Sequence, residues 1–264
     1  MSKKFLLSIL LFLVTSFTAG CTGESSDYNA LGNYKEVEME QVIIEDLSGL
    51  KELELENGVG NVEMKTTDSK ELSVKVKKSV KVSSDNNAKE LLDITDIKTF
   101  RSEDKISIKA VHIDDEKKDI WKLKSEKYPS SDLKITYFIE VPSNISSLIL
   151  KTGVGDVNVI DGRGVLDIET GVGNIYGKNI IPMQTSNFNS GTGNAEIKFA
   201  DLTESDLINV NCGVGNIKIF IPKDAKCTIE KEEFMKEKTR ELINGGGNLI
   251  QIKASMGDIE IEIE

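Results

Sequence analysis

Residues 152–177 read TGVGDVNVIDGRGVLDIETGVGNIYG, and this stretch contains the same turn twice, each time followed by an alternating apolar strand. The turn has the form Gly-x-Gly-Asn/Asp. It recurs from Asn57, Ser190 and Cys212, and a one-glycine variant begins at Ser255. From the copy at Thr152 onward, the last glycines of successive turns are separated by 18, 20, 22 and 42 residues, and the last gap is close to two periods. Repeats of this length, made of short strands and glycine turns, are typical of stacked β structures whose units bury apolar edges only against their neighbours.

The sequence therefore predicts an all-β fold, a single-stranded β-solenoid-like stack of about 20-residue glycine-turn repeats. Tight reversals between strands need backbone conformations with positive φ, which glycine adopts at little cost. The Asn or Asp after the second glycine is expected to bond nearby backbone groups as an Asx turn. The Thr, Ser or Cys that opens most of the turns is expected to be small-residue packing. The predicted structural turn residues are Gly58, Gly60, Gly153, Gly155, Gly171, Gly173, Gly191, Gly193, Gly213, Gly215 and Gly257.

The first half of the chain is less regular than the second. Alternating apolar residues predict strands before residue 113, and one short helix is expected over Asp85–Asp93, which has a capping residue and good helix formers. The charged stretch Asp114–Asp132 is interpreted as a long surface loop or irregular helix, followed by a strand over Leu133–Val141. For Glu230–Leu242, composition leaves two interpretations open, a helix or a charged excursion within a divergent repeat.

The N-terminus has the pattern of a secretory signal. Lys3 and Lys4 precede an apolar run of about ten residues, too short to span a membrane, and the tetrapeptide Thr18-Ala19-Gly20-Cys21 resembles a bacterial lipobox. Thr18 departs from the usual leucine, and the alternative is an ordinary signal with an incidental cysteine. We expect residues 1–20 to be a lipoprotein signal peptide, Cys21 to be lipidated, residues 21–46 to form the lipidated terminus and tether, and residues 47–264 to form the folded domain. The expected location is the extracytoplasmic face of a bacterial cell membrane, with the lipid as the membrane contact.

Charge and cysteine content restrict the partners. The chain has a net charge of −11, and removal of Lys3 and Lys4 with the signal leaves 31 basic against 44 acidic residues, or −13. Such a chain repels nucleic acid, so no nucleic-acid partner is expected. Cys212 and Cys227 remain after processing, and two cysteines without framework spacing are expected to be free buried thiols rather than a disulfide.

No residue pattern points to catalysis. His112 is the one histidine of the chain, which excludes a histidine-based triad or a multi-histidine metal site. The Gly-x-Gly turns precede strands rather than helices and lack the lysine of a phosphate-binding loop. Calcium binding of the β-roll type needs tandem nine-residue repeats, and these turns recur near 20 residues. We therefore expect no enzyme activity, no metal and no cofactor.

Several motifs in order along the chain resemble a known family. They are the glycine-turn strands, the strand entering a proline at Ile139–Pro142, a second such entry over Phe220–Ala225, and the closing Asn244–Gly247 with its final strand pair. Together they are similar to the toast-rack or adhesin-like domain of bacterial envelope proteins, over about Leu47 to Glu264. The resemblance implies a β-solenoid-like stack, a lipoprotein signal or membrane segment, and no established enzyme activity; adhesin is a provisional name in that family. The lost first glycine at Ser255 and Gly177 in place of an aliphatic residue are departures.

Trp121 and Tyr128 are the residues that hint at recognition. Aromatic side chains in a charged segment can contact a partner or a sugar ring, but they more commonly cover the open end of a solenoid. The expected function is a non-enzymatic binding or structural role, adhesin-like, toward an envelope protein or polysaccharide. Two alternatives are an envelope-stress sensory or regulatory module that acts on a membrane partner, and a polysaccharide-active enzyme. A clustered acidic cleft favours the enzyme, and a flat ladder face favours binding.

Overall fold

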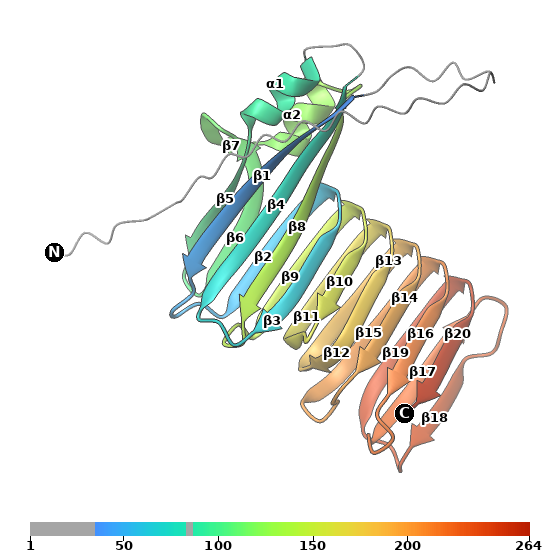
Figure 1. Cartoon of the computed structure of the whole chain (residues 1–264). Coiled ribbons are helices and arrows are strands. Elements are labelled where there is room, and N and C mark those ends of the chain that lie inside the picture. The colour runs from blue at the N-terminus through green and yellow to red at the C-terminus, as the bar shows by residue number, and fades with distance from the viewer. Residues whose placement is uncertain (1–34, 83–86) are drawn as a thin grey trace, which may run out of the picture.

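The computed structural model describes residues 35–82 and 87–264, and these ranges contain twenty strands and two helices (Figure 1). The strands form two ladders, here named sheet A and sheet B, which enclose one apolar core. The all-β stacked prediction is confirmed. Sheet A consists, in spatial order, of β1 (Lys35–Asp46), β4 (Glu71–Val82), β8 (Asp132–Pro142), β3 (Val62–Thr67), β10 (Val157–Ile160), β12 (Ile175–Pro182), β14 (Ala195–Phe199), β16 (Ile217–Ile221) and β20 (Ile259–Ile263).

Sheet B contains the strand that precedes the glycine turn in each rung, and it continues for two strands beyond the last rung. Its spatial order is β5 (Thr95–Ser102), β6 (Lys105–His112), β2 (Glu52–Val59), β9 (Ser147–Val154), β11 (Arg163–Val172), β13 (Gln184–Thr192), β15 (Ser205–Val214), β19 (Asn248–Met256), β17 (Cys227–Glu233) and β18 (Thr239–Ile243). The short β7 (Asp115–Asp119) pairs with β6. One strand of sheet B, a glycine turn and one strand of sheet A make a rung, and from β2 to β20 the rungs pair in parallel.

Period-two alternation builds the core, because successive side chains of a strand point to opposite faces. In sheet B one register row places Leu150, Ile168, Phe188, Val210 and Ile252 side by side, and all five are buried. The departure at Gly177 has a local cause. A Cβ there would lie 3.0 Å from Cγ1 of Ile180, which follows a register shift and fills the space in the row.

The stacked turns bring the glycines into two columns. A Cβ placed on Gly173 would lie 2.0 Å from the carbonyl oxygen of Gly155 in the previous rung, and one on Gly171 would lie 2.6 Å from the carbonyl oxygen of Gly153. The second glycines also have φ between 129° and 151°, as predicted, whereas the first glycines do not have positive φ. Close approach of backbones therefore favours glycine in both columns, and conformation requires it in the second. The first column accepts Ser255 in place of glycine in the last rung.

Polar side chains at the turns bond from rung to rung. The backbone N–H of Asn194 donates to Oδ1 of Asn174 at 2.9 Å, and the same bond links the Asn or Asp of every consecutive pair of turns from Asn61 to Asp258. The expected Asx turn within one repeat is replaced by this ladder between repeats. The slot of Thr170 is also more than packing, since its hydroxyl donates to the carbonyl oxygen of Gly155 at 2.8 Å.

Two expectations for the less regular segments need correction, and for a third segment the structure decides between two interpretations. The sheet begins at Lys35 rather than after residue 46, because β1 alternates and pairs along its whole length with β4. Residues 115–127 form β7 and a second helix, α2 (Ile120–Lys127), which the Asp119 side chain caps. Over Glu230–Leu242, where the sequence leaves a helix and a charged excursion both open, the structure has part of the β17–β18 hairpin and no helix, because parallel pairing with β19 overrides helix propensity. The expected short helix is confirmed as α1 (Asn87–Ile94).

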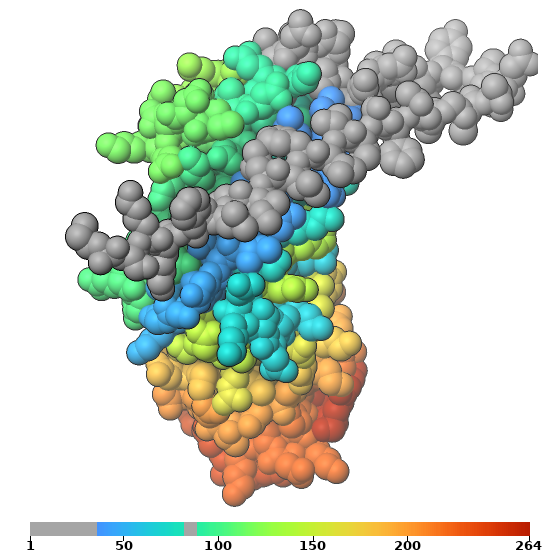
Figure 2. Space-filling model, turned by 60° about the vertical axis from the view of Figure 1, so that its left-hand side comes forward, coloured from blue at the N-terminus to red at the C-terminus, as the bar shows by residue number. Residues whose placement is uncertain are grey.

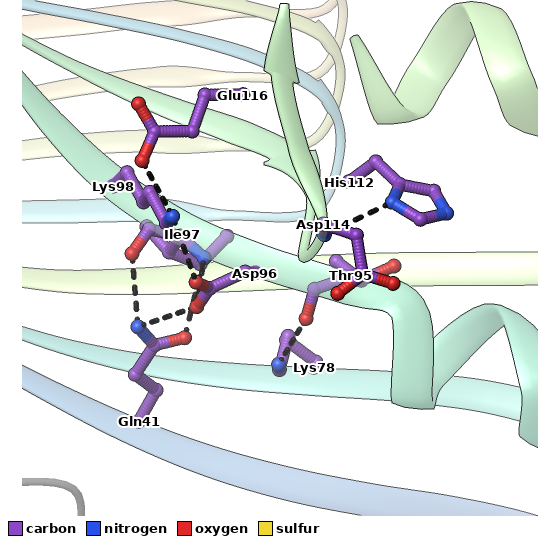
Figure 3. A network of polar contacts seen from close by, with 9 residues as sticks. All are labelled: Gln41, Lys78, Thr95, Asp96, Ile97, Lys98, His112, Asp114 and Glu116. Carbon is purple, nitrogen blue, oxygen red and sulfur yellow. Dashed lines mark hydrogen bonds and ion pairs between the residues drawn. The ribbon is translucent and has the colours of Figure 1, made fainter. Parts of the chain in front are cut away.

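Side-chain hydrogen bonds close the stack at the β1 end. Gln41 on β1 donates to Oδ1 of Asp96 at 3.0 Å and to the carbonyl oxygen of Ile97 at 2.9 Å, so it joins sheet A to sheet B (Figure 3). Lys78 on β4 is buried and donates to the carbonyl oxygen of Thr95 at 2.5 Å; its burial lowers the pKa of the ammonium, against the attraction of Asp96. The helices lie at this same end, and β17–β20 lie at the other (Figures 1 and 2).

Candidate binding surface

Trp121 and Tyr128 both lie against the fold rather than projecting from it. Each is half-buried and packs on the core. A Cβ placed on Gly58 would lie 2.4 Å from Cδ2 of Trp121. The indole therefore covers the end of the first-glycine column, at its first glycine. Tyr128 caps α2, and burial, followed by the nearby Glu90 carboxylate, raises the pKa of its phenol. Both positions agree with the interpretation as a cap, and a contact with a partner stays a prediction.

The remaining candidate residues have structural surroundings. His112 ends β6, and its Nδ1 accepts the backbone N–H of Asp114 at 3.1 Å (Figure 3). Among residues 35–82 and 87–264, no group of three or more His, Cys, Asp or Glu side chains could hold a metal ion. In the same residues no helix is both long and apolar enough to cross a membrane. Cys21 and the signal sequence lie outside the described residues.

Cys212 and Cys227 are free and buried, as expected. Burial raises the pKa of the Cys212 thiol to about 11, and burial with the nearby Glu241 carboxylate raises the pKa of Cys227. A raised pKa lowers the thiolate fraction that reacts at neutral pH. Both residues are therefore parts of the core rather than reactive groups.

The outer face of sheet B carries a flat strip of amide side chains that the sequence analysis did not identify. Asn187 and Asn209 are register partners on β13 and β15, as are Asn189 and Asn211. The Nδ2 atom of Asn209 donates to Oδ1 of Asn187 at 2.9 Å, and that of Asn211 donates to Oδ1 of Asn189 at 2.8 Å. Gln251 on β19 continues the row of Asn209. We name these five residues the amide ladder; all are half-exposed.

Paired charges border the amide ladder on both sides. On β9, Lys151 lies 3.3 Å from Asp167 and 3.4 Å from Glu169. The attraction of the Asp167 carboxylate is the main cause that raises the pKa of this lysine. On β17, Glu230 accepts hydrogen bonds from Lys238 and Gln251, which lower the pKa of its carboxyl group. The five side chains of the amide ladder carry no charge themselves, so between these charged borders they form an uncharged strip that can both donate and accept hydrogen bonds.

One signal in the sequence could have located the amide ladder. The tripeptides Asn187-Phe188-Asn189 and Asn209-Val210-Asn211 have the same polar–apolar–polar pattern, and they lie 22 residues apart, which is one repeat. Strand periodicity places both asparagines of each tripeptide on one face, and parallel stacking then aligns the two pairs. The carboxylates next to the amide ladder, on β11 and β17, form ion pairs.

Comparison with known proteins gives structural neighbours only. No family model matches the chain, and no curated protein matches it. A crystal structure of a candidate cell-adhesion protein from Clostridium sporogenes has 16% identity and a TM-score of 0.45, with 88% of this chain and 100% of that chain covered. A candidate adhesin from Bacteroides fragilis has 12% identity and a TM-score of 0.36, over 85% of this chain and 97% of that one. A third, from Parabacteroides merdae, has 12% identity and a TM-score of 0.25, over 88% and 98%.

Proposed function

We propose that this chain is a lipid-anchored protein of the bacterial cell envelope whose β stack binds a polysaccharide without converting it. The amide ladder is the observation that carries the proposal. Sugar hydroxyls donate and accept hydrogen bonds, and side-chain amides do both in return. Adjacent rungs repeat every ~4.8 Å, so an extended polymer can meet the same pair of amides on successive strands.

The shape and charge of the face favour binding over catalysis. The carboxylates beside the amide ladder are bonded to lysines, and the neighbouring charges lower the pKa of Glu230 and Glu232. A paired-acid hydrolase needs one carboxyl group with a raised pKa, to act as the general acid. The amide ladder has instead the uncharged, regular character of a strip that binds a neutral polymer.

The lipid anchor is proposed from the lipobox-like tetrapeptide that ends at Cys21. Replacement of this residue, Cys21→Ser, is expected to release the protein from the membrane fraction or to leave an unprocessed precursor. The measurement is fractionation of cells followed by detection of the precursor and mature forms. Unchanged anchoring and processing in the variant would contradict the lipidation.

Binding is tested with cell-wall polysaccharide and insoluble peptidoglycan as the probes, in a sedimentation assay. The double variant Asn187→Val/Asn209→Val removes two of the three amides of one row, leaving Gln251, and introduces residues that suit a strand. We expect it to bind about fivefold more weakly, because the pair contributes about 1 kcal/mol. The matched control is Asn158→Val, an asparagine on the outer face of sheet A. Equal binding by both variants, or polysaccharide turnover lost on a single carboxylate substitution, would refute the proposal.

A further inference from the structure

The two sheets end differently at the C-terminal side of the stack. Sheet B is extended beyond β19 by β17 and β18, whereas β20 ends sheet A and, within residues 35–82 and 87–264, pairs only with β16. No strand of the described residues lies opposite β17 in sheet A. The position beside β20 is therefore one strand short of a complete stack (Figure 1).

The hydrogen bonds of β20 show which backbone groups face this open position. The backbone N–H of Glu264 donates to Ile221 of β16 at 2.9 Å, and the carbonyl oxygen of Asp258 accepts from Ile217 at 2.9 Å. Even-numbered residues therefore bond inward to β16. The N–H of Ile259 donates instead to Oε1 of Glu233 at 3.0 Å, on the opposite edge. By the two-residue period, the N–H and C=O groups of Ile261 and Ile263 point to the same open edge.

Exposure of the apolar row increases toward the same edge. Ile219 of β16 is fully buried, whereas its register partner Ile261 is half-buried and Ile263 is 52% exposed. In the interior of the stack such residues are covered by the next rung. Beside β20, Phe234 and Met235 in the turn of the β17–β18 hairpin are also exposed, at 59% and 91%. A strand that pairs with β20 would cover apolar surface as well as satisfy backbone groups.

The outward side chains of β20 are acidic. Glu260 and Glu262 share one cation, Lys218, at 3.2 and 2.6 Å, and Glu264 pairs with Lys198. The chain itself contains a matching case at its other end, where the acidic β1 pairs with β4. The sequence of β4 is ELSVKVKKSVKV, and its Lys77 lies 2.7 Å from Glu38 of β1.

We propose that the open edge of β20 receives an extended segment of another protein in which apolar residues alternate with lysine or arginine. The backbone of the segment pairs with Ile261 and Ile263, its apolar residues cover the exposed isoleucines, and its cations lie beside Glu260 and Glu262. A second copy fits less well. Both outer strands of sheet A, β1 and β20, carry rows of glutamates, and like charges on neighbouring strands repel.

A labelled peptide with the sequence of residues 71–82, ELSVKVKKSVKV, tests the proposal by fluorescence anisotropy on the purified full-length protein in detergent at low salt. The control peptide has glutamate in place of each lysine. We expect the basic peptide to bind at least about tenfold more tightly than the acidic one. The double variant Glu260→Lys/Glu262→Lys is expected to reverse this preference. A preference unchanged by the double variant, or no binding of the basic peptide at ~100 μM, overturns the proposal.

A second variant tests the role of the backbone edge. Ile261→Pro removes an N–H that faces away from β16, so pairing with β16 is kept while the open edge is blocked. We expect loss of peptide binding with a melting temperature close to that of the unchanged protein. If this variant does not fold, the charge-reversal pair still decides the question. Self-association of the protein that is abolished by Ile261→Pro would assign the edge to a second copy and overturn the heterotypic partner.

Discussion

Alanine substitutions at three glycines separate the two reasons for glycine in the turns. Gly245 has φ +89° and no atom within 4 Å of an added Cβ, so Gly245→Ala introduces conformational strain alone. Gly171 lacks positive φ, but its Cβ would lie 2.6 Å from the carbonyl oxygen of Gly153, so it introduces a steric clash alone. Gly173 combines φ +151° with a Cβ 2.0 Å from the carbonyl oxygen of Gly155.

The expected losses of unfolding free energy follow from these geometries. Strain at a single left-handed position costs about 1 kcal/mol, which is the expectation for Gly245→Ala. Forcing an atom into a packed backbone contact costs about 2 kcal/mol, which applies to Gly171→Ala. Gly173→Ala has both penalties at shorter distance, and the Gly155 carbonyl that must move accepts the hydroxyl of Thr170. We therefore expect about 4 kcal/mol at Gly173, or roughly 12 °C in melting temperature.

Thermal unfolding followed by circular dichroism measures the three variants against the unchanged chain. The order Gly173, Gly171, Gly245, from largest to smallest loss, is the test. A loss at Gly173 no larger than that at Gly245 would show that contact between rungs does not require the glycine columns. Equal and negligible losses at all three would refute the conformational argument as well.

Three further predictions use other contacts. Thr170→Val removes the donor to the Gly155 carbonyl and should cost about 1 kcal/mol in chemical denaturation, whereas Thr185→Val, at an exposed position, should change stability by less than about 0.5 kcal/mol. With Cys21 replaced by Ser, the native protein should not react with a thiol reagent at pH 8, and both Cys212 and Cys227 should react after denaturation; rapid labelling of the native state would contradict their burial. Bonds from Lys238 and Gln251 lower the pKa of Glu230, and a bond from Lys253 lowers that of Glu232. Their folded-state pKa values lie below the unfolded value of about 4.3, so the stability they contribute is complete above that pH and is lost as the pH falls through the lowered values. The melting temperature should therefore decrease as the pH is lowered below about 4. A melting temperature that stays constant down to about pH 3 would argue against these bonds.

The sequence predicts those parts of the fold that local chemistry determines. Turns such as Gly171-Val172-Gly173 and the alternation around Ile168 repeat at one period, so stacking follows from the pattern. The β17–β18 hairpin does not follow, because residues such as Glu232 and Lys236 favour helix locally and only pairing with β19 makes them a hairpin. The hydrogen bonds between the Asn and Asp residues of successive turns do not follow from local sequence either, because each joins residues about one repeat apart, such as Asn174 and Asn194.

The candidate surfaces needed the register as well as the pattern. The asparagines of β13 and β15 form a strip only because the two strands pair without an offset after Thr185. The hydrogen bond from Gln41 that joins the two sheets is made to Asp96, 55 positions away, and nothing in the local sequence predicts it. At the open edge, the acidic alternation of residues 258–264 was visible in the sequence, but the missing neighbour is a consequence of strand order alone.

The charges on β20 have two consequences for the same edge. An unpaired strand with exposed isoleucines is a template on which any extended chain can add, and proteins limit this hazard with charged side chains on the edge. Glu260 and Glu262 outnumber the one lysine between them, so an identical strand placed alongside would bring glutamates next to glutamates. The same excess attracts a strand with cations at alternate positions, as β1 attracts β4. Protection against self-association and selection of a basic partner therefore follow from one pattern of charge.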